Sequence, residues 1–591
     1  MHLKLYYFWR FCQNSLKMRF IFSILILIMS FLTGSATQNT SQNSSFISPL
    51  KGPFSFAGGF GELRPSHFHS GLDFRTQGKI GLPVFAAKDG YISRIGISST
   101  GYGNALYMNH SDGTTTVYGH LLKFNPKIRE YTTEKQYDRE SFQINLTPSS
   151  DQFCFKKGEI IGWTGNSGSS GGPHLHFEVR DTKSETALNP LLYNLGITDK
   201  SAPKIIALYI YPLDDESNVG NDNTKKRFET IATSPGKYRL KNKVPIELLG
   251  QVGFGIQAED FFNGTGMKCG IYSATLFCDN KEVFGFKMDK IAFQDTRYAN
   301  SQADFEEHLR SNRWIEHLFR QPGNILDLYY PKQSNGIMNF TDGQEHDFEV
   351  IVCDAFKNKS ILRFKTTGKK SKVTLTRIPY TKVFLYDRPN NFENDKIRIE
   401  MPTGVLYDNL KFKWKTEPTP AGCYSEMHQV HNGFTPVNNP YTLSLKCQDL
   451  PDHLKDKALI VYFDPIKKKK TAVGGEYSRG WVTVKTNLLG NFSVTADQIP
   501  PTIISLSVKE NKILADPQKV QFHISDDLSG IYTYRGEIDG KWVLFEYDEK
   551  SGTLTYHFDK TRMVFGKSHL LRLVVTDYKE NSSEYKAIIY K

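Results

Sequence analysis

Cysteine is scarce in this chain, which has 7 cysteines among 591 residues. No two of them form a C-x-x-C pair, so the spacing that is typical of zinc knuckles is missing. Six lie beyond the N-terminal segment, at irregular intervals: Cys154, Cys269, Cys278, Cys353, Cys423 and Cys447. The sequence therefore predicts no cysteine-based metal site and no particular disulfide pairing.

An apolar run long enough to cross a bilayer is missing from the N-terminal segment. Residues 20–32 are apolar with few interruptions, but a transmembrane helix needs about 20 such residues. Lys17 and Arg19 precede this run, and small residues at 34–36 follow it, which is the order of parts in a signal peptide. We therefore expect a signal peptide over residues 1–36, export to the periplasm, cell envelope or extracellular space, and no stable transmembrane anchor.

Charge of one sign is only in modest excess. The chain has 74 Lys and Arg against 62 Asp and Glu, giving a net charge of +12. Four lysines at 467–470 are interpreted as a solvated face rather than as a docking site for an anionic wall or membrane surface. No nucleic-acid-binding module is recognisable, and an export signal argues further against a nucleic-acid partner.

The chain is too long for one hydrophobic core, since domains average about 150 residues. Hydrophobic residues make up 39% and aromatic residues 13%, a composition that favours packed, mainly β structure. Polar residues 37–50 are predicted to be a linker. Residues 51–198, rich in glycine and short β-type runs, predict an antiparallel sheet or compact barrel, with Asp112-Gly113 as a hairpin turn.

The remaining chain carries a weak internal repeat, which predicts immunoglobulin-like β-sandwich modules at 199–370 and 496–591. Residues 371–495 are predicted to be β-rich, with a fold that the sequence does not identify. Asp260 and Asp526-Asp527 occupy similar contexts and could bind calcium, although turn residues are the favoured interpretation. The repeated strings are Ala202-Pro203-Lys204-Ile205-Ile206 with Pro500-Pro501-Thr502-Ile503-Ile504, and Val350-Ile351-Val352-Cys353-Asp354 with Leu573-Val574-Val575-Thr576-Asp577.

Two histidines two residues apart begin a predicted strand, His174-Leu175-His176-Phe177-Glu178-Val179. Successive side chains of a strand alternate between its faces, so both imidazoles lie on one face. The pair could hold a metal, or one histidine could bind metal while the other moves protons. The alternative is a half-buried strand whose histidines only fill space.

More metal-ligand types lie upstream of this pair. His69-Ser70-Gly71-Leu72-Asp73 offers an imidazole and a carboxylate, and Gly71 would permit a tight turn that aims both at one point. Together with His176 these residues give three protein ligands and leave a fourth position to water, which is the arrangement of catalytic zinc. His120 lies at the end of a predicted strand. His67, spaced like His174 from the next histidine, competes with His69, and His110 is interpreted as a packing residue at a strand end.

An ordered series of motifs over about residues 51–197 resembles the lysostaphin-type (LytM-like) zinc endopeptidases, which cut peptide cross-links of peptidoglycan. The motifs are Phe60-Gly61-Glu62-Leu63-Arg64, His69-x-Gly71-x-Asp73, Gly81-x-Pro83-Val84-x-Ala86-Ala87, Gly101-Tyr102-Gly103-Asn104, Tyr118-x-His120-Leu121, Lys157-Gly158-x-x-Ile161-Gly162, Thr164-Gly165-Asn166-Ser167-Gly168 and Gly172-Pro173-His174-Leu175-His176-Phe177-Glu178.

The resemblance implies a role for each of these residues. It makes His69, Asp73 and His176 the ligands of one zinc ion, and His67 a rim or structural residue, because only His69 is in register with Gly71 and Asp73. His174 is expected to be the general base and His120 mainly to polarise the substrate carbonyl. Tyr102 and Asn104 are candidate substrate-binding residues. Residues 125–151 depart from the family by a longer excursion, which would form either a groove wall or a surface loop.

The sequence therefore predicts an exported zinc endopeptidase that hydrolyses amide bonds in stem peptides or cross-links of peptidoglycan. The C-terminal β modules would be spacers, or docking surfaces for other envelope proteins. One alternative is a catalytically silent wall-binding module that activates another hydrolase. The other is an envelope adhesin or assembly protein whose β modules carry the function.

Overall fold

The computed structural model describes residues 46–53, 55–264, 268–369, 379–508 and 518–591. The expected signal peptide at 1–36 lies outside the described residues, as do residues 37–45 of the expected linker. Within the described ranges, no helix is both long and apolar enough to cross a membrane. The structure is built almost entirely of antiparallel sheets, so the prediction of a mainly β chain with β-rich modules after the N-terminal one is confirmed.

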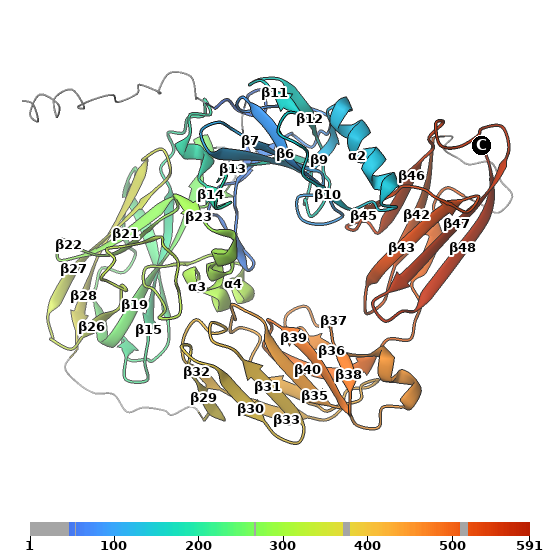
Figure 1. Cartoon of the computed structure of the whole chain (residues 1–591). Coiled ribbons are helices and arrows are strands. Elements are labelled where there is room, and N and C mark those ends of the chain that lie inside the picture. Colours follow the sequence, from blue (N-terminus) through green and yellow to red (C-terminus); the bar gives the residue numbers. More distant parts are fainter. Residues whose placement is uncertain (1–45, 54, 265–267, 370–378, 509–517) are drawn as a thin grey trace, which may run out of the picture. The chain divides into compact units, whose positions relative to one another are not determined.

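The first module is a large sheet whose strands surround one hydrophobic core (Figure 1). The Asp112-Gly113 hairpin is confirmed, because it joins two strands that pair antiparallel, β7 (Ala105–Asn109) and β8 (Thr114–Gly119). The main path of this sheet runs β1 (Phe56–Gly58), β4 (Leu72–Arg75), β13 (His174–Asp181), β8 (Thr114–Gly119), β7 (Ala105–Asn109), β6 (Gly90–Ile97) and β10 (Ile144–Leu146), with β11 (Cys154–Phe155), β14 (Ala187–Leu188) and β23 (Lys290–Ile291) paired beside it. A second sheet has β5 (Pro83–Phe85), β12 (Ile160–Thr164) and β9 (Leu121–Phe124), and β2 (Leu63–Arg64) pairs with β3 (His67–Phe68).

Strand β13 is central to this module because both of its faces are buried. Leu175, Phe177 and Val179 point into the core and are fully buried, so the intervening residues must face the opposite side of the sheet. That opposite face carries His174, His176 and Glu178. The sheet therefore presents these three side chains side by side at a fixed spacing.

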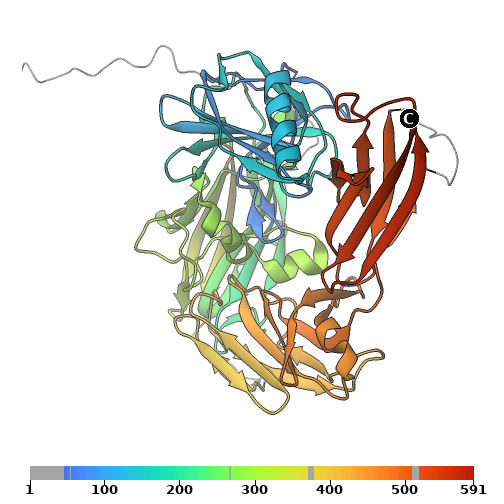
Figure 2. The same cartoon turned by 45° about the vertical axis from the view of Figure 1, so that its right-hand side comes forward.

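Two segments that the sequence describes as irregular pack against the core of this module. Phe46 and Leu50, inside the expected linker, are buried in that core. Residues 125–151 contain helix α2 (Pro126–Asp138) and strand β10 rather than a loop, and Figure 2 shows the helix alongside its sheet. The Asn125 side chain caps α2 by accepting a hydrogen bond from the Lys127 backbone N–H. Ile128, Thr132 and Gln136 follow at four-residue spacing and form its buried face.

Three further groups of sheets follow, each around a hydrophobic cluster, and the first of these clusters also includes Phe60, Leu63 and Phe68 of the N-terminal module. The next sheet has the main path β16 (Asn218–Val219), β19 (Ile246–Phe261), β15 (Lys204–Pro212), β17 (Lys226–Ser234), β18 (Lys237–Leu240), β28 (Lys359–Gly368), β27 (Glu345–Cys353), β21 (Ser273–Cys278), β22 (Lys281–Lys287) and β25 (Tyr329–Tyr330), while β20 (Lys268–Cys269), β24 (Glu316–His317) and β26 (Met338–Phe340) pair with β19. Short helices α3 (Ala299–Gln302) and α4 (Phe305–Ser311) lie in the same stretch.

Residues 381–497 form two five-stranded sheets around one core, and residues 502–590 form two four-stranded sheets around another. The first pair is β30 (Asn390–Glu393), β31 (Ile397–Met401), β35 (Tyr441–Lys446), β39 (Trp481–Thr486), β38 (Glu476–Ser478) and β33 (Trp414–Glu417), β34 (Met427–Val430), β40 (Gly490–Ala496), β36 (Ala458–Phe463), β37 (Lys470–Gly474), with β29 (Lys382–Phe384) and β32 (Leu410–Phe412) paired beside it. The second pair is β41 (Thr502–Ser505), β42 (Lys519–Ser525), β46 (Thr553–His557), β45 (Phe545–Asp548) and β44 (Lys541–Trp542), β43 (Ile531–Ile538), β47 (Ser568–Asp577), β48 (Ser582–Tyr590). The immunoglobulin-like topology and the exact module boundaries remain predictions.

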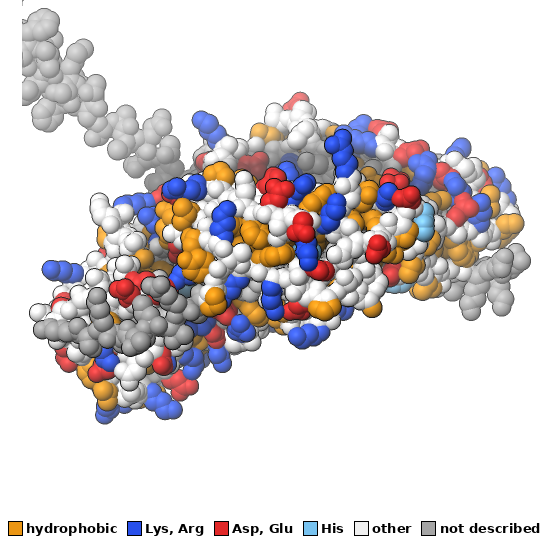
Figure 3. All heavy atoms as spheres, turned by 90° about the horizontal axis from the view of Figure 1, so that it is seen from below, with side chains coloured by type: hydrophobic (Ala, Val, Ile, Leu, Met, Phe, Trp, Pro, Cys, Tyr) orange, Lys and Arg blue, Asp and Glu red, His pale blue; other side chains and the backbone are white. Residues whose placement is uncertain are grey.

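One face of the molecule and the cysteines bear on the sequence predictions of charge and disulfide pairing. On the face seen in Figure 3, Lys and Arg side chains are interspersed with Asp and Glu. The six cysteines at 154, 269, 278, 353, 423 and 447 are all free in the described part of the chain.

Candidate metal centre

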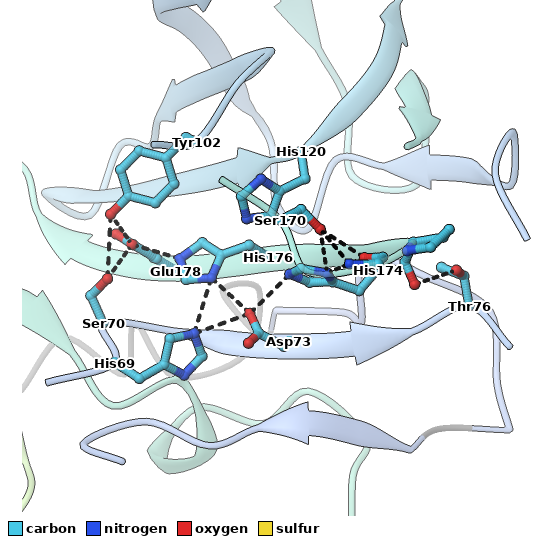
Figure 4. Close-up of polar contacts among 12 residues, drawn as sticks. His69, Ser70, Asp73, Thr76, Tyr102, His120, Ser170, His174, His176 and Glu178 are labelled. Atoms are coloured by element: carbon cyan, nitrogen blue, oxygen red, sulfur yellow. Dashed lines mark hydrogen bonds and ion pairs between the residues drawn. The ribbon is translucent and has the colours of Figure 1, made fainter. Parts of the chain in front are cut away.

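Strand β4, the residues just before it, and strand β13 bring three possible metal ligands together on one side of the sheet. His176 lies directly opposite Asp73 of β4 in the strand register, and it lies opposite Gly119 of β8 on its other side. His69 precedes β4 and is buried, as are Asp73 and His176. Figure 4 shows these side chains pointing toward one another.

The possible ligand atoms form a nearly equilateral triangle. Asp73 Oδ1 lies 3.0 Å from His69 Nε2 and 2.9 Å from His176 Nδ1, and the two nitrogens are 3.1 Å apart. Atoms bound about 2.0–2.1 Å from a tetrahedral zinc ion lie about 3.3 Å from one another. The triangle therefore has nearly the size that zinc requires, and imidazole nitrogens with a carboxylate oxygen are donors that zinc accepts.

The other polar atom of each ligand is held by a partner that fixes its orientation. His69 Nδ1 donates a hydrogen bond to the Gly59 carbonyl at 2.7 Å, and His176 Nε2 donates one to Glu178 at 2.8 Å. Each ring therefore turns its second nitrogen, with a lone pair, toward the centre. Asp73 Oδ2 accepts from Arg64 Nη2 at 3.3 Å, which leaves Oδ1 for the centre.

Electrostatics around the triangle favour a positive charge at its centre. Burial opposes ionisation of Asp73, but His69, His174 and His176 hold the pKa of its carboxyl well below its ordinary value. Burial likewise opposes a charged His176, yet its hydrogen bonds to Asp73 and Glu178 raise its pKa to about 9. In the absence of metal, a proton on His176 therefore supplies the charge that a cation would bring, and metal binding must displace it.

His120 and His174 lie beside the triangle and form a pair with ring centroids 4.7 Å apart. His120 Nδ1 donates to the Ser167 carbonyl at 2.8 Å, and His174 Nδ1 donates to the Gly172 carbonyl at 2.8 Å. Nε2 of each ring is therefore the atom available for chemistry. His174 Nε2 lies 3.4 Å from Asp73 Oδ1, which places it next to the triangle.

His120 is held in a backbone conformation that is rare for a residue with a side chain. Its φ is +59°, and it occupies the single position between β8 and β9. Its N–H donates to the Tyr102 carbonyl at 2.8 Å, which fixes this turn. Burial, followed by the nearby His176 and His174, lowers the pKa of His120 to about 3, so its ring is neutral at pH 7.

Glu178 lies directly behind His176 in this centre, at a position that the motifs do not mark as a ligand or catalytic residue. Its carboxylate is fully buried and accepts hydrogen bonds from His176 Nε2, Ser70 Oγ, Tyr102 Oη and Arg180 Nε at 2.5–2.8 Å. Burial opposes its ionisation, but Arg180 and His176 hold its pKa far below the ordinary value. The sequence did contain a signal, because Glu178 continues the two-residue spacing of His174 and His176.

The other candidate residues lie around this centre in different ways. Tyr102 donates to Glu178, and Asn104 Nδ2 donates to the Leu121 carbonyl at 3.0 Å, so both have partners inside the module. Substrate binding by these two residues stays a prediction. His67 is exposed and its ring contacts the Pro65 carbonyl at 3.0 Å. His110 is buried, with both ring nitrogens bonded, to Asp89 O and Thr116 Oγ1.

Gly71 is needed for space rather than for an unusual turn. A Cβ at this position would lie 2.4 Å from the Phe177 carbonyl oxygen and 2.9 Å from Glu178 Cγ. The chain between His69 and Asp73 therefore passes so close to β13 that only glycine fits. This close approach brings His69 within reach of His176.

We expect Glu178→Gln to lower zinc affinity about 10- to 100-fold, the usual cost of losing a carboxylate that orients a ligating histidine. The neutral amide no longer fixes Nε2 of His176 as the protonated nitrogen, so Nδ1 is less often available to metal. Zinc affinity would be measured by competition with a chelating dye, with circular dichroism confirming the fold.

The matched control is Glu185→Gln. Glu185 is 67% exposed at its side chain and lies 3.7 Å from the same Arg180, so this change weakens the arginine's environment without touching His176. It should leave zinc affinity unchanged. Equal affinities of folded Glu178→Gln and wild type would contradict the orienting role.

Comparison with known proteins agrees with the geometry over a limited segment. The family model described as Peptidase family M23 matches residues 67–136, and one described as a Zu5-like domain matches residues 381–497. The DD-carboxypeptidase/endopeptidase Mpg of Neisseria meningitidis serogroup B is 35% identical over 118 residues, which are 20% of this chain and 21% of Mpg. Lysostaphin of Staphylococcus staphylolyticus is 34% identical over 126 residues, 21% of each chain.

Among solved structures, the catalytic domain of lysostaphin from Staphylococcus simulans is 30% identical, covers 23% of this chain and 90% of that one, and has a TM-score of 0.18. The chain spans about one fifth of the length of the curated relatives it matches. It therefore contains a Peptidase family M23 domain, and the resemblance to lysostaphin-type peptidases over this segment is confirmed. The matched residues 67–136 include His69, Asp73 and His120, while His174 and His176 lie beyond them.

Proposed function

We propose that residues 51–198 act as an exported, zinc-dependent endopeptidase that hydrolyses amide bonds in peptidoglycan stem peptides or cross-links. The observation that carries this proposal is the triangle of His69 Nε2, Asp73 Oδ1 and His176 Nδ1, with sides of 2.9–3.1 Å. The relatives named as lysostaphin and as a glycyl-glycine endopeptidase support the substrate class. The N-terminal charge and apolar pattern supports export.

Zinc held by these three residues would supply a Lewis acid and an activated water. The chain's own residues then move the protons and stabilise charge. One Nε2 of the His120 and His174 pair takes a proton from the attacking water, and the other donates to the oxygen of the scissile carbonyl as negative charge develops there. The proton taken from the water by the acceptor histidine then passes to the leaving amine nitrogen as the C–N bond breaks, which completes the cleavage.

The positions of the protons on the His120 and His174 rings support roles for these two residues that are the reverse of those expected from the motifs. The neutral ring of His120, with Nδ1–H bound to the Ser167 carbonyl, offers a lone pair at Nε2 and suits the proton acceptor. His174 Nε2 lies 3.4 Å from Asp73 Oδ1, beside the triangle, and is the ring nitrogen of the pair that is left to donate to the oxyanion. We therefore assign proton acceptance to His120 and oxyanion stabilisation to His174.

The experiment that tests the proposed function combines metal analysis with digestion of purified sacculi. We expect one zinc ion per chain and, after digestion, new amine ends in muropeptides, whose masses identify the bond that is cut. Zinc-free protein should release none. A purified, folded protein without bound zinc would contradict the proposal, and a zinc-bound protein that releases no new amine ends would favour the silent wall-binding module instead.

A further inference from the structure

A second group of buried acidic side chains lies in the part of the chain that follows the peptidase domain. Asp199 precedes β15, Asp260 is near the end of β19, and Asp354 follows β27 directly. Each offers a carboxylate oxygen, and these oxygens all lie within 4.8 Å of one another. The three residues are 7%, 7% and 2% exposed, so three carboxylates are brought together away from water.

Two oxygens of this cluster are buried without any hydrogen-bond donor. Asp199 Oδ1 accepts from the backbone N–H groups of Ser201 and Asn263, at 2.9 Å each, but its Oδ2 has no partner. Asp260 Oδ1 likewise has none. Burying a carboxylate oxygen without a donor or cation is costly, so these two atoms indicate that a ligand is missing.

The two residues also line a small internal cavity of about 20 Å³. A cavity of this size holds about one water molecule or one small ion. The cavity that Asp199 and Asp260 line is therefore large enough for a single cation and too small for an organic ligand.

Protein cations do not neutralise the cluster. Among the described residues, no lysine or arginine forms an ion pair with Asp199, Asp260 or Asp354. Three carboxylates this close together repel one another unless a bound cation lies between them.

A similar cluster near the C-terminus provides an internal comparison. Asp497, Asp526 and Asp577 also bring carboxylate oxygens within 4.8 Å of one another. Its hydrogen bonds repeat those of the first cluster: the Asn581 amide binds Asp577 and the Asp497 carbonyl, as the Asn358 amide binds Asp354 and the Asp199 carbonyl.

The two clusters differ at two of their three positions: Asp526 corresponds to Asp260, and Asp497 corresponds to Asp199. Asp526 is only partly buried, and both oxygens of Asp497 accept backbone hydrogen bonds, from Ile499 and Ser529. The first cluster alone therefore combines near-complete burial with unpartnered oxygens on two of its aspartates. The inference is restricted to that cluster.

We propose that Asp199, Asp260 and Asp354 form a calcium-binding site. All the donors that the three side chains offer are carboxylate oxygens, which hard cations prefer. Mg²⁺ usually keeps several of its waters, for which a cavity of this size leaves no room, whereas Ca²⁺ is bound by protein oxygens in flexible geometry. Asp260 lies at the end of a strand, so the expectation that it is only a turn residue is replaced.

This site would bind calcium whether or not the peptidase domain is active, so its test does not depend on the proposed function. The full chain would be decalcified on a chelating resin, reloaded with one equivalent of zinc, and titrated with CaCl₂ in a calorimeter. Thermal unfolding would be followed in parallel. At 100 times the dissociation constant we expect the unfolding midpoint to rise by about 5 °C or more.

The test variant is Asp260→Asn, which keeps the side-chain shape and removes one negative charge. It relieves repulsion in the empty site, so it should fold with a midpoint no lower than that of wild type without calcium. We expect it to lose the calcium-induced rise in the midpoint, with at least a tenfold drop in calcium affinity.

Asp295→Asn is the matched control, because Asp295 is a partly buried aspartate from the same stretch that lies outside the cluster. It should bind calcium as wild type does. No calcium-induced shift in wild type, or an undiminished shift in Asp260→Asn, would overturn the proposal. Equal affinities for MgCl₂ and CaCl₂ would overturn the assignment to calcium.

Discussion

His176→Ala is expected to abolish zinc binding, whereas His174→Ala should keep zinc and lose turnover. His176 Nδ1 is one corner of the ligand triangle, and two remaining ligands hold zinc weakly. His174 has its Nδ1 bound to the Gly172 carbonyl and presents Nε2 beside Asp73, so its removal leaves all three corners in place. We expect kcat/KM on sacculi-derived muropeptides to fall about 10²- to 10⁴-fold in His174→Ala.

Bound zinc would be measured by atomic absorption after gel filtration, and turnover by the appearance of new amine ends. His67→Ala is the matched control, because His67 has the same spacing from His69 as His174 has from His176 but is exposed and outside the triangle. It should bind zinc and turn over at the wild-type rate. Equal zinc loss in His174→Ala and His176→Ala would show that β13 has been assigned wrongly.

The pH dependence of the same variants separates proton acceptor from donor. When a group must be protonated for catalysis, kcat/KM falls as the pH rises and the group loses its proton. This fall is the alkaline limb of the pH profile. If His174 is the donor, that limb should flatten in the residual activity of His174→Ala and persist in His120→Ala. The opposite result would restore the division of roles that the motifs imply.

Gly71→Ala is expected to lose zinc and to destabilise the peptidase domain. The new Cβ would lie 2.4 Å from the Phe177 carbonyl oxygen and 3.1 Å from His176 Cε1, so β4 and β13 must move apart near the ligands. Overpacking of this kind costs about 1–3 kcal/mol in unfolding free energy. Because the displaced backbone joins His69 to Asp73, two of the three ligands move with it.

Zinc content and thermal unfolding would be measured together for this variant. Gly96→Ala is the control: Gly96 lies in β6, and a Cβ there meets no atom within 4 Å. It should keep zinc and stability near wild-type values. Full zinc occupancy in Gly71→Ala would show that the strands tolerate separation and that space is not the reason for glycine.

Local patterns account for what could be predicted from the sequence. The alternation along β13 separates Leu175 and Phe177 from His174 and His176, because the period of a strand is two. The Asp112-Gly113 hairpin is local in the same way. The prediction of His69, Asp73 and His176 as ligands depends on the order of the motifs along the chain. Nothing in the composition relates His69 to a strand that begins more than a hundred residues later.

Contacts that depend on tertiary structure could not be predicted. His69, His120 and His174 are each oriented by a backbone carbonyl, of Gly59, Ser167 and Gly172. Every residue has a carbonyl group, so no sequence signal identifies these partners. For the same reason, the crowding that requires Gly71 and the burial of Phe46 follow only from how distant segments pack.

Backbone carbonyl groups orient three of the histidines of the metal centre. The path of the main chain around the centre therefore cannot change, whereas the side chains on that main chain can. Gly171 and Gly172 precede His174, and a Cβ at either would meet no atom within 4 Å. Neither has a left-handed backbone, so both positions accept larger residues. The segment before β13 can therefore be varied in side chain, to alter which peptides reach the site, provided that its length is kept.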